Sequence, residues 1–165
     1  MDDWEWEQRL DALWAACDDY GEDDFVAKMG ALVAERPAND PVALFELAGA
    51  HDSTGHEAEA VGLYRRALGF GLAGIRRRRA TIQLASSLRN VGQAEEGVAL
   101  LRAEREAGSD ELDDAVSAFL ALLLVDTGRE REAVGLALAA LAPHLPRYQR
   151  SLKHYAQELT AAAAR

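Results

Sequence analysis

Residues 41–74 read PVALFELAGAHDSTGHEAEAVGLYRRALGFGLAG, and this stretch decides the fold. Its apolar residues return at intervals of three and four, which predicts two amphipathic helices, over 41–53 and 56–70. Asp40 followed by Pro41 is a helix start signal, because proline at the first helical position gives up only an N–H that would be unpaired anyway. Gly55 separates the two helices, so the stretch predicts an antiparallel helical hairpin.

The same pattern recurs further along the chain. A Leu-Ala pair stands eight residues before a glycine in three places, at Leu47-Ala48 with Gly55, Leu84-Ala85 with Gly92, and Leu120-Ala121 with Gly128. The pairs recur after 37 and then 36 residues, a period typical of helical-hairpin solenoids. A small residue in the first helix lets the second approach closely, and the glycine reverses the chain between them.

Helical periodicity continues beyond these repeats and predicts an all-α protein. We expect nine helices, over residues 3–19, 23–37, 41–53, 56–70, 76–90, 94–106, 111–126, 130–142 and 147–162. They form one predicted domain, 1–165, with a degenerate N-terminal hairpin (1–40), three repeats (41–74, 78–111, 114–147) and a C-terminal capping helix (147–165). A chain of 165 residues is long enough to bury a core as a single domain.

The composition of the chain argues against a disulfide-bonded, a membrane-spanning and a nucleic-acid-binding protein. The single cysteine, Cys17, excludes an intramolecular disulfide, and the N-terminus lacks a secretory signal pattern, so we expect a cytoplasmic protein. No apolar run reaches the roughly 20 residues that a membrane span needs. The net charge of −10 argues against nucleic-acid binding. Acidic residues dominate 1–24, whereas 60–94 holds seven Arg and no Asp or Glu, which predicts two surfaces of opposite charge.

A set of residues in the first repeat resembles the tetratricopeptide repeat (TPR) signature, namely Leu47-Ala48, His51, Gly55, Ala60, Tyr64 and Ala67-Leu68. Within that family the chain is similar to small stand-alone bacterial proteins of tetratrico peptide repeat group 5. The resemblance implies an α-α superhelix whose first helices line a concave groove, and a role as an adaptor or scaffold that binds a peptide segment or a partner protein, without catalysis.

Carried onto this chain, the resemblance implies a partner-binding groove at Phe45, Asp52, Arg79, Gln83, Ser86, Arg89 and Asn90. The part of this groove that the middle repeat supplies is cationic, so we expect a partner with an acidic segment. Three alternatives stand for the run Arg76–Arg79: it binds the partner, it is only a solvated helix start, or it pairs with the acidic first helix of this or a second molecule.

A second hypothesis is structural self-association as a homodimer. Trp4 and Trp6 are two residues apart and cannot share one helix face, so one of them is expected to be exposed for a contact with a second chain. No residue constellation supports an enzyme, and neither a metal nor a cofactor is predicted. The pair His51-Asp52 lacks further metal ligands, and His51 falls where such repeats bury a large side chain.

Overall fold

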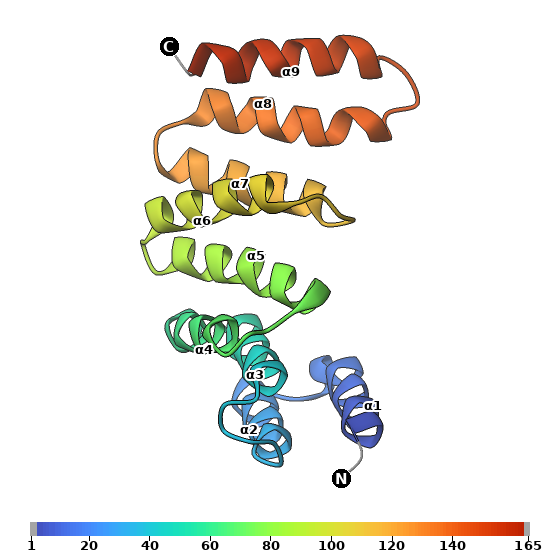
Figure 1. Cartoon of the computed structure of the whole chain (residues 1–165), viewed down its shortest axis with the longest axis vertical. Helices are drawn as coiled ribbons and strands as arrows, with labels where there is room; N and C mark the ends of the chain where they lie inside the picture. The colour runs from blue at the N-terminus through green and yellow to red at the C-terminus, as the bar shows by residue number, and fades with distance from the viewer. Residues whose placement is uncertain (1–2, 164–165) are drawn as a thin grey trace. The chain divides into compact units, whose positions relative to one another are not determined.

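The computed structural model describes residues 3–163, and this part of the chain folds into nine α-helices without any β-strand (Figure 1). The all-α prediction is confirmed. The helices are α1 (Asp3–Ala15), α2 (Glu22–Val33), α3 (Pro41–Ser53), α4 (Glu57–Gly69), α5 (Gly74–Asn90), α6 (Ala94–Ala107), α7 (Asp113–Asp126), α8 (Glu130–Leu141) and α9 (Gln149–Ala163). Two short 3₁₀ helices, η1 (Cys17–Asp19) and η2 (Ala142–His144), follow α1 and α8.

The chain divides into two compact units, Met1–Ala80 and Thr81–Arg165, which we call the N-terminal and the C-terminal unit. The division falls within α5. A core in the N-terminal unit joins α1, α2 and α3 through Trp6, Leu10, Phe25, Met29, Leu32, Ala43 and Ala50. A core in the C-terminal unit joins α5 to α8 through residues that include Ile82, Val98, Leu101, Val116, Leu120, Leu124 and Leu136. Burial of these apolar side chains is the main force that holds each unit together.

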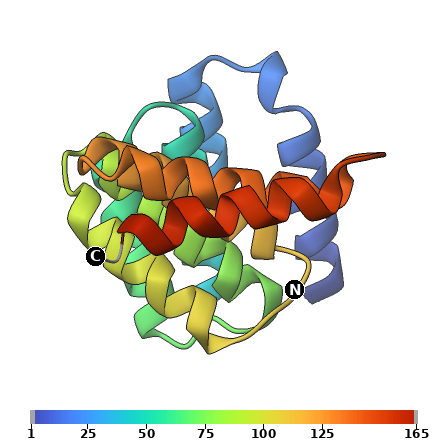
Figure 2. The same cartoon turned by 90° about the horizontal axis from the view of Figure 1, so that it is seen from above.

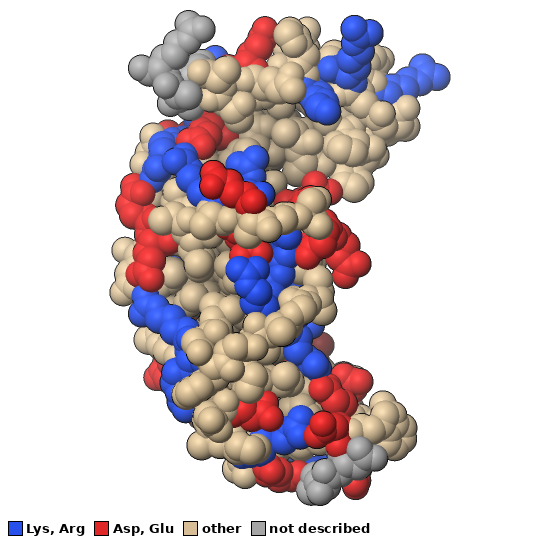
Figure 3. Space-filling model, viewed as in Figure 1, with Lys and Arg blue, Asp and Glu red and all other residues tan. Residues whose placement is uncertain are grey.

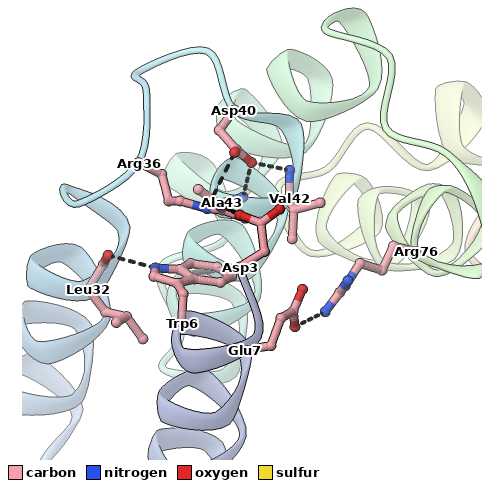
Figure 4. Close-up of polar contacts among 9 residues, drawn as sticks. All are labelled: Asp3, Trp6, Glu7, Leu32, Arg36, Asp40, Val42, Ala43 and Arg76. Carbon is pink, nitrogen blue, oxygen red and sulfur yellow. Dashed lines mark hydrogen bonds and ion pairs between the residues drawn. The ribbon is translucent and has the colours of Figure 1, made fainter. Parts of the chain in front are cut away.

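The start of α3 agrees with the sequence. Pro41 is its first residue, and the Asp40 carboxylate accepts hydrogen bonds from the backbone N–H groups of Val42 (2.9 Å) and Ala43 (3.0 Å) (Figure 4). These N–H groups have no partner within the helix, so the side chain satisfies donors that would otherwise need water.

The ends of several other helices differ from the expectation: α2 ends at Val33 instead of residue 37, α5 begins at Gly74 instead of residue 76, and α9 begins at Gln149 instead of residue 147. The first helix ends at Ala15 instead of residue 19, and the chain continues in the 3₁₀ turn η1. Asp18 and Asp19 lie in that turn, and two carboxylates at a helix C-terminus oppose the helix dipole. The helix α7 begins at Asp113, two residues later than predicted, because Asp110 and Asp113 form a local turn in which the Asp110 carboxylate accepts from Leu112 N–H at 2.8 Å.

The three repeat glycines reverse the chain as predicted. Gly55, Gly92 and Gly128 have φ angles of 76°, 79° and 74°, a left-handed conformation that glycine adopts without the steric cost of a side chain. After each glycine, the next N–H donates back into the preceding helix, as from His56 to the carbonyl of His51 at 2.9 Å. The chain reversal therefore has the same backbone geometry at all three glycines.

Close helix packing in the C-terminal unit depends on small residues. The helices α8 and α9 lie side by side in both views (Figure 1, Figure 2). A Cβ added to Gly135 of α8 would lie 2.9 Å from the carbonyl oxygen of Ala156 in α9. Contact this close leaves no room for a side chain, so Gly135 sets the distance between the two helices.

Candidate partner-binding surfaces

The two N-terminal tryptophans point to opposite sides of α1. Trp6 is 1% exposed, and its Nε1 donates to the carbonyl oxygen of Leu32 at 3.1 Å (Figure 4). The Arg36 guanidinium lies 4.7 Å from the centre of the Trp6 ring. Trp4 is 69% exposed. Residues two apart on a helix are separated by roughly 200°, so one is buried when the other faces solvent. Trp6 is therefore a core residue, and Trp4 is the one of the pair that faces solvent.

The first arginine of the run is engaged within the N-terminal unit. Arg76 Nη2 donates to Glu7 of α1 at 2.5 Å, and its Nε donates to Glu46 of α3 at 3.3 Å (Figure 4 shows the Glu7 contact). For Arg76 this confirms the alternative in which the acidic first helix of the same molecule lies against the basic run. Arg76 links α1, α3 and α5, so its role is structural.

Glu46 lies at the centre of this network. Its side chain is buried, and Trp14 Nε1 donates to its Oε2 at 2.9 Å. Burial raises the pKa of the Glu46 carboxyl above its ordinary value, although the bond from Trp14 and the charge of Arg76 favour the ionised form. Sequence reasoning missed Glu7, Trp14 and Glu46 as interacting residues. The signal for Glu46 is that it is the one charged residue in the apolar run 41–50.

Arg79 lies over an aromatic platform in the same unit. Its guanidinium is 5.4 Å from the centre of the Phe45 ring, and that ring lies 6.2 Å from Tyr64. The Phe45 side chain is buried, with 2% of its surface exposed. Arg79 itself is exposed, and it forms no ion pair with a carboxylate between residues 3 and 163.

Asp52 is held by a neighbour on α4. The Tyr64 hydroxyl donates to Asp52 Oδ2 at 3.4 Å. Burial, together with the nearby Asp52 charge, raises the pKa of Tyr64 well above its ordinary range, so the hydroxyl keeps its proton as a donor. The N-terminal unit thus brings Phe45 and Arg79 together and places Asp52 against Tyr64.

The predicted groove residues of the C-terminal unit all lie on α5. Gln83, Ser86 and Arg89 are half-buried, and Asn90 is exposed. Arg89 Nε forms an ion pair with Asp126 Oδ2 of α7 at 2.5 Å, so its charge is already balanced. Gln83 Oε1 is buried and accepts no hydrogen bond from the described residues.

Charged side chains of opposite sign lie close together on one face of the protein. On the face shown in Figure 3, Lys and Arg side chains lie next to Asp and Glu side chains over most of the surface. Acidic residues of α1 pair with arginines of other segments, as in Asp3 with Arg36 and Glu7 with Arg76. These pairs balance individual acidic residues of α1 locally, and the two surfaces of opposite charge stay a prediction.

The part of the chain that the structure describes contains neither a metal-ligand cluster nor a membrane-spanning helix. Between residues 3 and 163, no three His, Cys, Asp or Glu side chains come together as metal ligands. In the same range, no helix combines the length and apolar character needed to cross a membrane.

Comparison with known proteins identifies one family. A tetratrico peptide repeat family model matches residues 41–159. Searches of curated proteins and of solved structures found no match. Repeats of this family generally mediate protein–protein interactions and are typically non-catalytic.

Proposed function

Because the chain belongs to the tetratrico peptide repeat family, we propose that it is an adaptor that holds an acidic segment of another protein against α5. The proposed contact residues are Phe45, Asp52, Arg79, Gln83, Ser86, Arg89 and Asn90. They do not contribute equally, since their surroundings differ.

The proposal rests mainly on the exposure and the contacts of Arg79. Arg79 is exposed, and its guanidinium lies 5.4 Å from the centre of the buried Phe45 ring. It forms no ion pair with a carboxylate of residues 3–163, although its charge acts on the Glu46 carboxyl. The contact with the ring restricts the guanidinium, which lowers the entropy cost of binding a carboxylate through two parallel hydrogen bonds. An Asp or Glu side chain of a partner fits this requirement.

Polar side chains further along α5 support a peptide as the ligand. The buried Gln83 Oε1 is an acceptor without a donor among the described residues, and an unsatisfied buried acceptor costs about 1–3 kcal/mol. A backbone N–H of a bound segment would satisfy this acceptor once the Gln83 side chain rotates toward the surface. Arg89 has a smaller expected role, because a partner carboxylate must compete there with Asp126.

The test is capture from a lysate of the source organism with wild type, Arg79→Glu and a control, Arg105→Glu. Arg105 is an exposed arginine of α6, so the control carries the same charge change on another helix. We expect a protein that wild type and the control retain and that Arg79→Glu loses, with circular dichroism showing that all three are folded.

The bound segment is then made as a peptide and titrated by fluorescence anisotropy. We expect Arg79→Glu to weaken binding at least about tenfold, which corresponds to about 1.4 kcal/mol, and neutral replacements of the peptide's acidic residues to do the same. Equal affinity of the wild type and Arg79→Glu for that peptide would refute the proposed site.

A second candidate function is self-association through the N-terminal helix. The exposure of Trp4 favours it, because a large exposed aromatic ring is a frequent anchor of protein interfaces. Sedimentation velocity over a range of concentrations, with wild type and Trp4→Ala, tests this candidate. A mass that stays monomeric at every concentration rejects it.

A further inference from the structure

One face of α7 is apolar and exposed to solvent. Leu122 and Val125 are 47% and 48% exposed, and Ala118, which precedes Leu122 by one turn, is exposed as well. Residues three and four apart lie on the same side of a helix. The three side chains therefore form one strip about 10 Å long, which we call the α7 strip.

The carboxylates on this face of α7 lie at its two ends, and both are engaged within the C-terminal unit. Asp114 contacts Nε2 of His144 at 2.8 Å, and Asp126 pairs with Arg89 at 2.5 Å. Asp113, the first residue of the helix, lies on the opposite side. Residues 115–125 contain no charged side chain, so the α7 strip is uncharged along its length.

The exposed face of α9 is cationic. Residues 133–157 contain Arg147, Arg150 and Lys153 but no Asp or Glu. Arg150 and Lys153 are exposed, and neither forms an ion pair with a carboxylate of residues 3–163. Figure 3 shows Lys and Arg side chains gathered over the start of α9, at the upper right. Glu158, the one carboxylate of α9, lies on another side of the helix and contacts His154 at 3.3 Å.

The repeat spacing places this cationic face beside the α7 strip. Ala156 of α9 is buried, as Ala121 of α7 is, and the two alanines stand 35 residues apart. With the same spacing, Lys153 corresponds to Ala118 of the strip. Equivalent faces of successive helical repeats line the same side of the stack, so the cations of α9 and the strip share one surface of the C-terminal unit.

The start of α9 is also held near the start of α7. The 3₁₀ turn η2 leads into α9, and its His144 contacts Asp114 in the first turn of α7. The connection is compact, because Nε2 of Gln149 donates back to the carbonyl oxygen of Pro143 at 3.1 Å. Arg150, the second residue of α9, therefore lies toward the same end of the unit as the first half of the α7 strip.

We propose that the α7 strip and the cationic face of α9 together bind an amphipathic acidic segment of a partner protein, with its apolar side chains against the strip and its carboxylates at Arg150 and Lys153. Charge complementarity selects this occupant, since a basic segment would be repelled and a neutral one would leave both cations without a counter-charge. Covering the exposed apolar strip adds to the binding free energy. This surface goes beyond the contact on α5 and does not depend on Arg79.

Selection from a display library of random peptides of about 15 residues, or about four helical turns, is the first step of the test. The bait is the Arg79→Glu variant, so the peptides that it enriches do not need the contact proposed on α5. We expect them to carry apolar residues three and four apart together with Asp or Glu.

The most enriched peptide is then titrated by fluorescence anisotropy against variants with matched controls. Val125→Gln should weaken binding at least about tenfold, whereas Val134→Gln, the same change at a valine of α8 that is 49% exposed, should bind like wild type. Arg150→Glu should also weaken binding at least about tenfold, whereas Arg105→Glu on α6 should not. Circular dichroism checks that each variant is folded.

Three results would overturn the proposal. The first is that no peptide is enriched, and the second is an enriched peptide that binds Val125→Gln and Arg150→Glu as tightly as wild type. The third is another occupant, detected by sedimentation with vesicles of phosphatidylcholine and phosphatidylglycerol and by sedimentation velocity of the protein alone. Vesicle binding or a dimer that Arg150→Glu abolishes, without peptide binding, would assign the surface to an anionic membrane or to a second copy. The contact on α5 is tested separately, because the bait already lacks Arg79.

Discussion

At the level of single residues, the surroundings of Glu46 give it a role that its residue type does not suggest. Glutamate is normally exposed, yet this side chain is buried between Trp14 of α1 and Arg76 of α5. A buried carboxylate is tolerated when hydrogen bonds and an opposite charge compensate the loss of water. Glu46 therefore joins three helices at the cost of keeping a charge away from solvent.

The first prediction concerns the pH dependence of stability. A carboxyl group whose pKa is raised in the folded state, as for Glu46, binds its proton more tightly in the folded than in the unfolded chain. Its contribution to stability is fully present below the unfolded pKa and is lost as the pH rises through the folded pKa. Glu46→Gln removes this loss, while the new amide oxygen can still accept from Trp14. We expect the difference in melting temperature between Glu46→Gln and wild type to increase in favour of the variant between about pH 4 and about pH 8.

Differential scanning calorimetry at several pH values measures this difference. The exposed Glu5 of the same unit supplies the control Glu5→Gln, which carries the same chemical change without burial and should follow wild type. The melting temperature of Glu46→Gln could instead change with pH in parallel with that of wild type, or fall below it as the pH rises. Either result would contradict the conclusion that burial raises the pKa of Glu46.

At the level of helices, equivalent repeat positions face different neighbours. Gly62 on α4 and Gly135 on α8 occupy the same place in the first and third repeats. A Cβ at Gly62 would meet no described atom within 4 Å, whereas one at Gly135 would lie 2.7 Å from Thr160 Cγ2 and 2.9 Å from the Ala156 carbonyl oxygen. The same substitution should therefore have opposite effects in the two repeats.

The second prediction uses this pair of glycines. Gly135→Ala forces the backbone of α9 to move, so we expect it to lower the free energy of unfolding by about 1–3 kcal/mol. Gly62→Ala removes the conformational freedom of a helical glycine without a clash and should raise stability by about 0.5–1 kcal/mol. Urea unfolding at a fixed protein concentration measures both, and equal shifts in the two variants would show that the close contact at Gly135 is relieved at little cost.

At the level of the whole molecule, the question is whether the two compact units unfold together. The three tryptophans, Trp4, Trp6 and Trp14, all lie in the N-terminal unit, so their fluorescence reports on that unit alone. Far-UV circular dichroism reports on the helices of both units. The chain is continuous α-helix across the division within α5, and short arrays of helical repeats tend to unfold cooperatively.

The third prediction is that both signals change at the same urea concentration. We also expect Gly135→Ala, a change in the C-terminal unit, to lower the midpoint seen by tryptophan fluorescence as much as that seen by circular dichroism. A fluorescence midpoint that stays at the wild-type value while the circular dichroism midpoint falls would show two independent units, and would reject the single-domain prediction for 1–165.

The amino-acid sequence by itself determined the all-α class, the repeats, the glycine reversals and the Asp40–Pro41 start of α3. These features depend on interactions between residues that are close in the chain, namely helical periodicity, capping and backbone freedom. Sequence also indicated that Trp4 and Trp6 face different ways. It did not tell which of them is buried, because that depends on where α2 packs.

Only the tertiary structure decided which arginines of α5 form ion pairs within the chain. Arg76, Arg79 and Arg89 are the same residue type on one helix, yet Arg76 pairs with Glu7, Arg89 pairs with Asp126, and Arg79 lies on an aromatic ring. The ion-pair partners are 69 and 37 residues away in sequence, beyond the reach of any local pattern. For the same reason, the confinement of Gly135 follows from which helix packs next to α8, and not from the repeat motif that carries it.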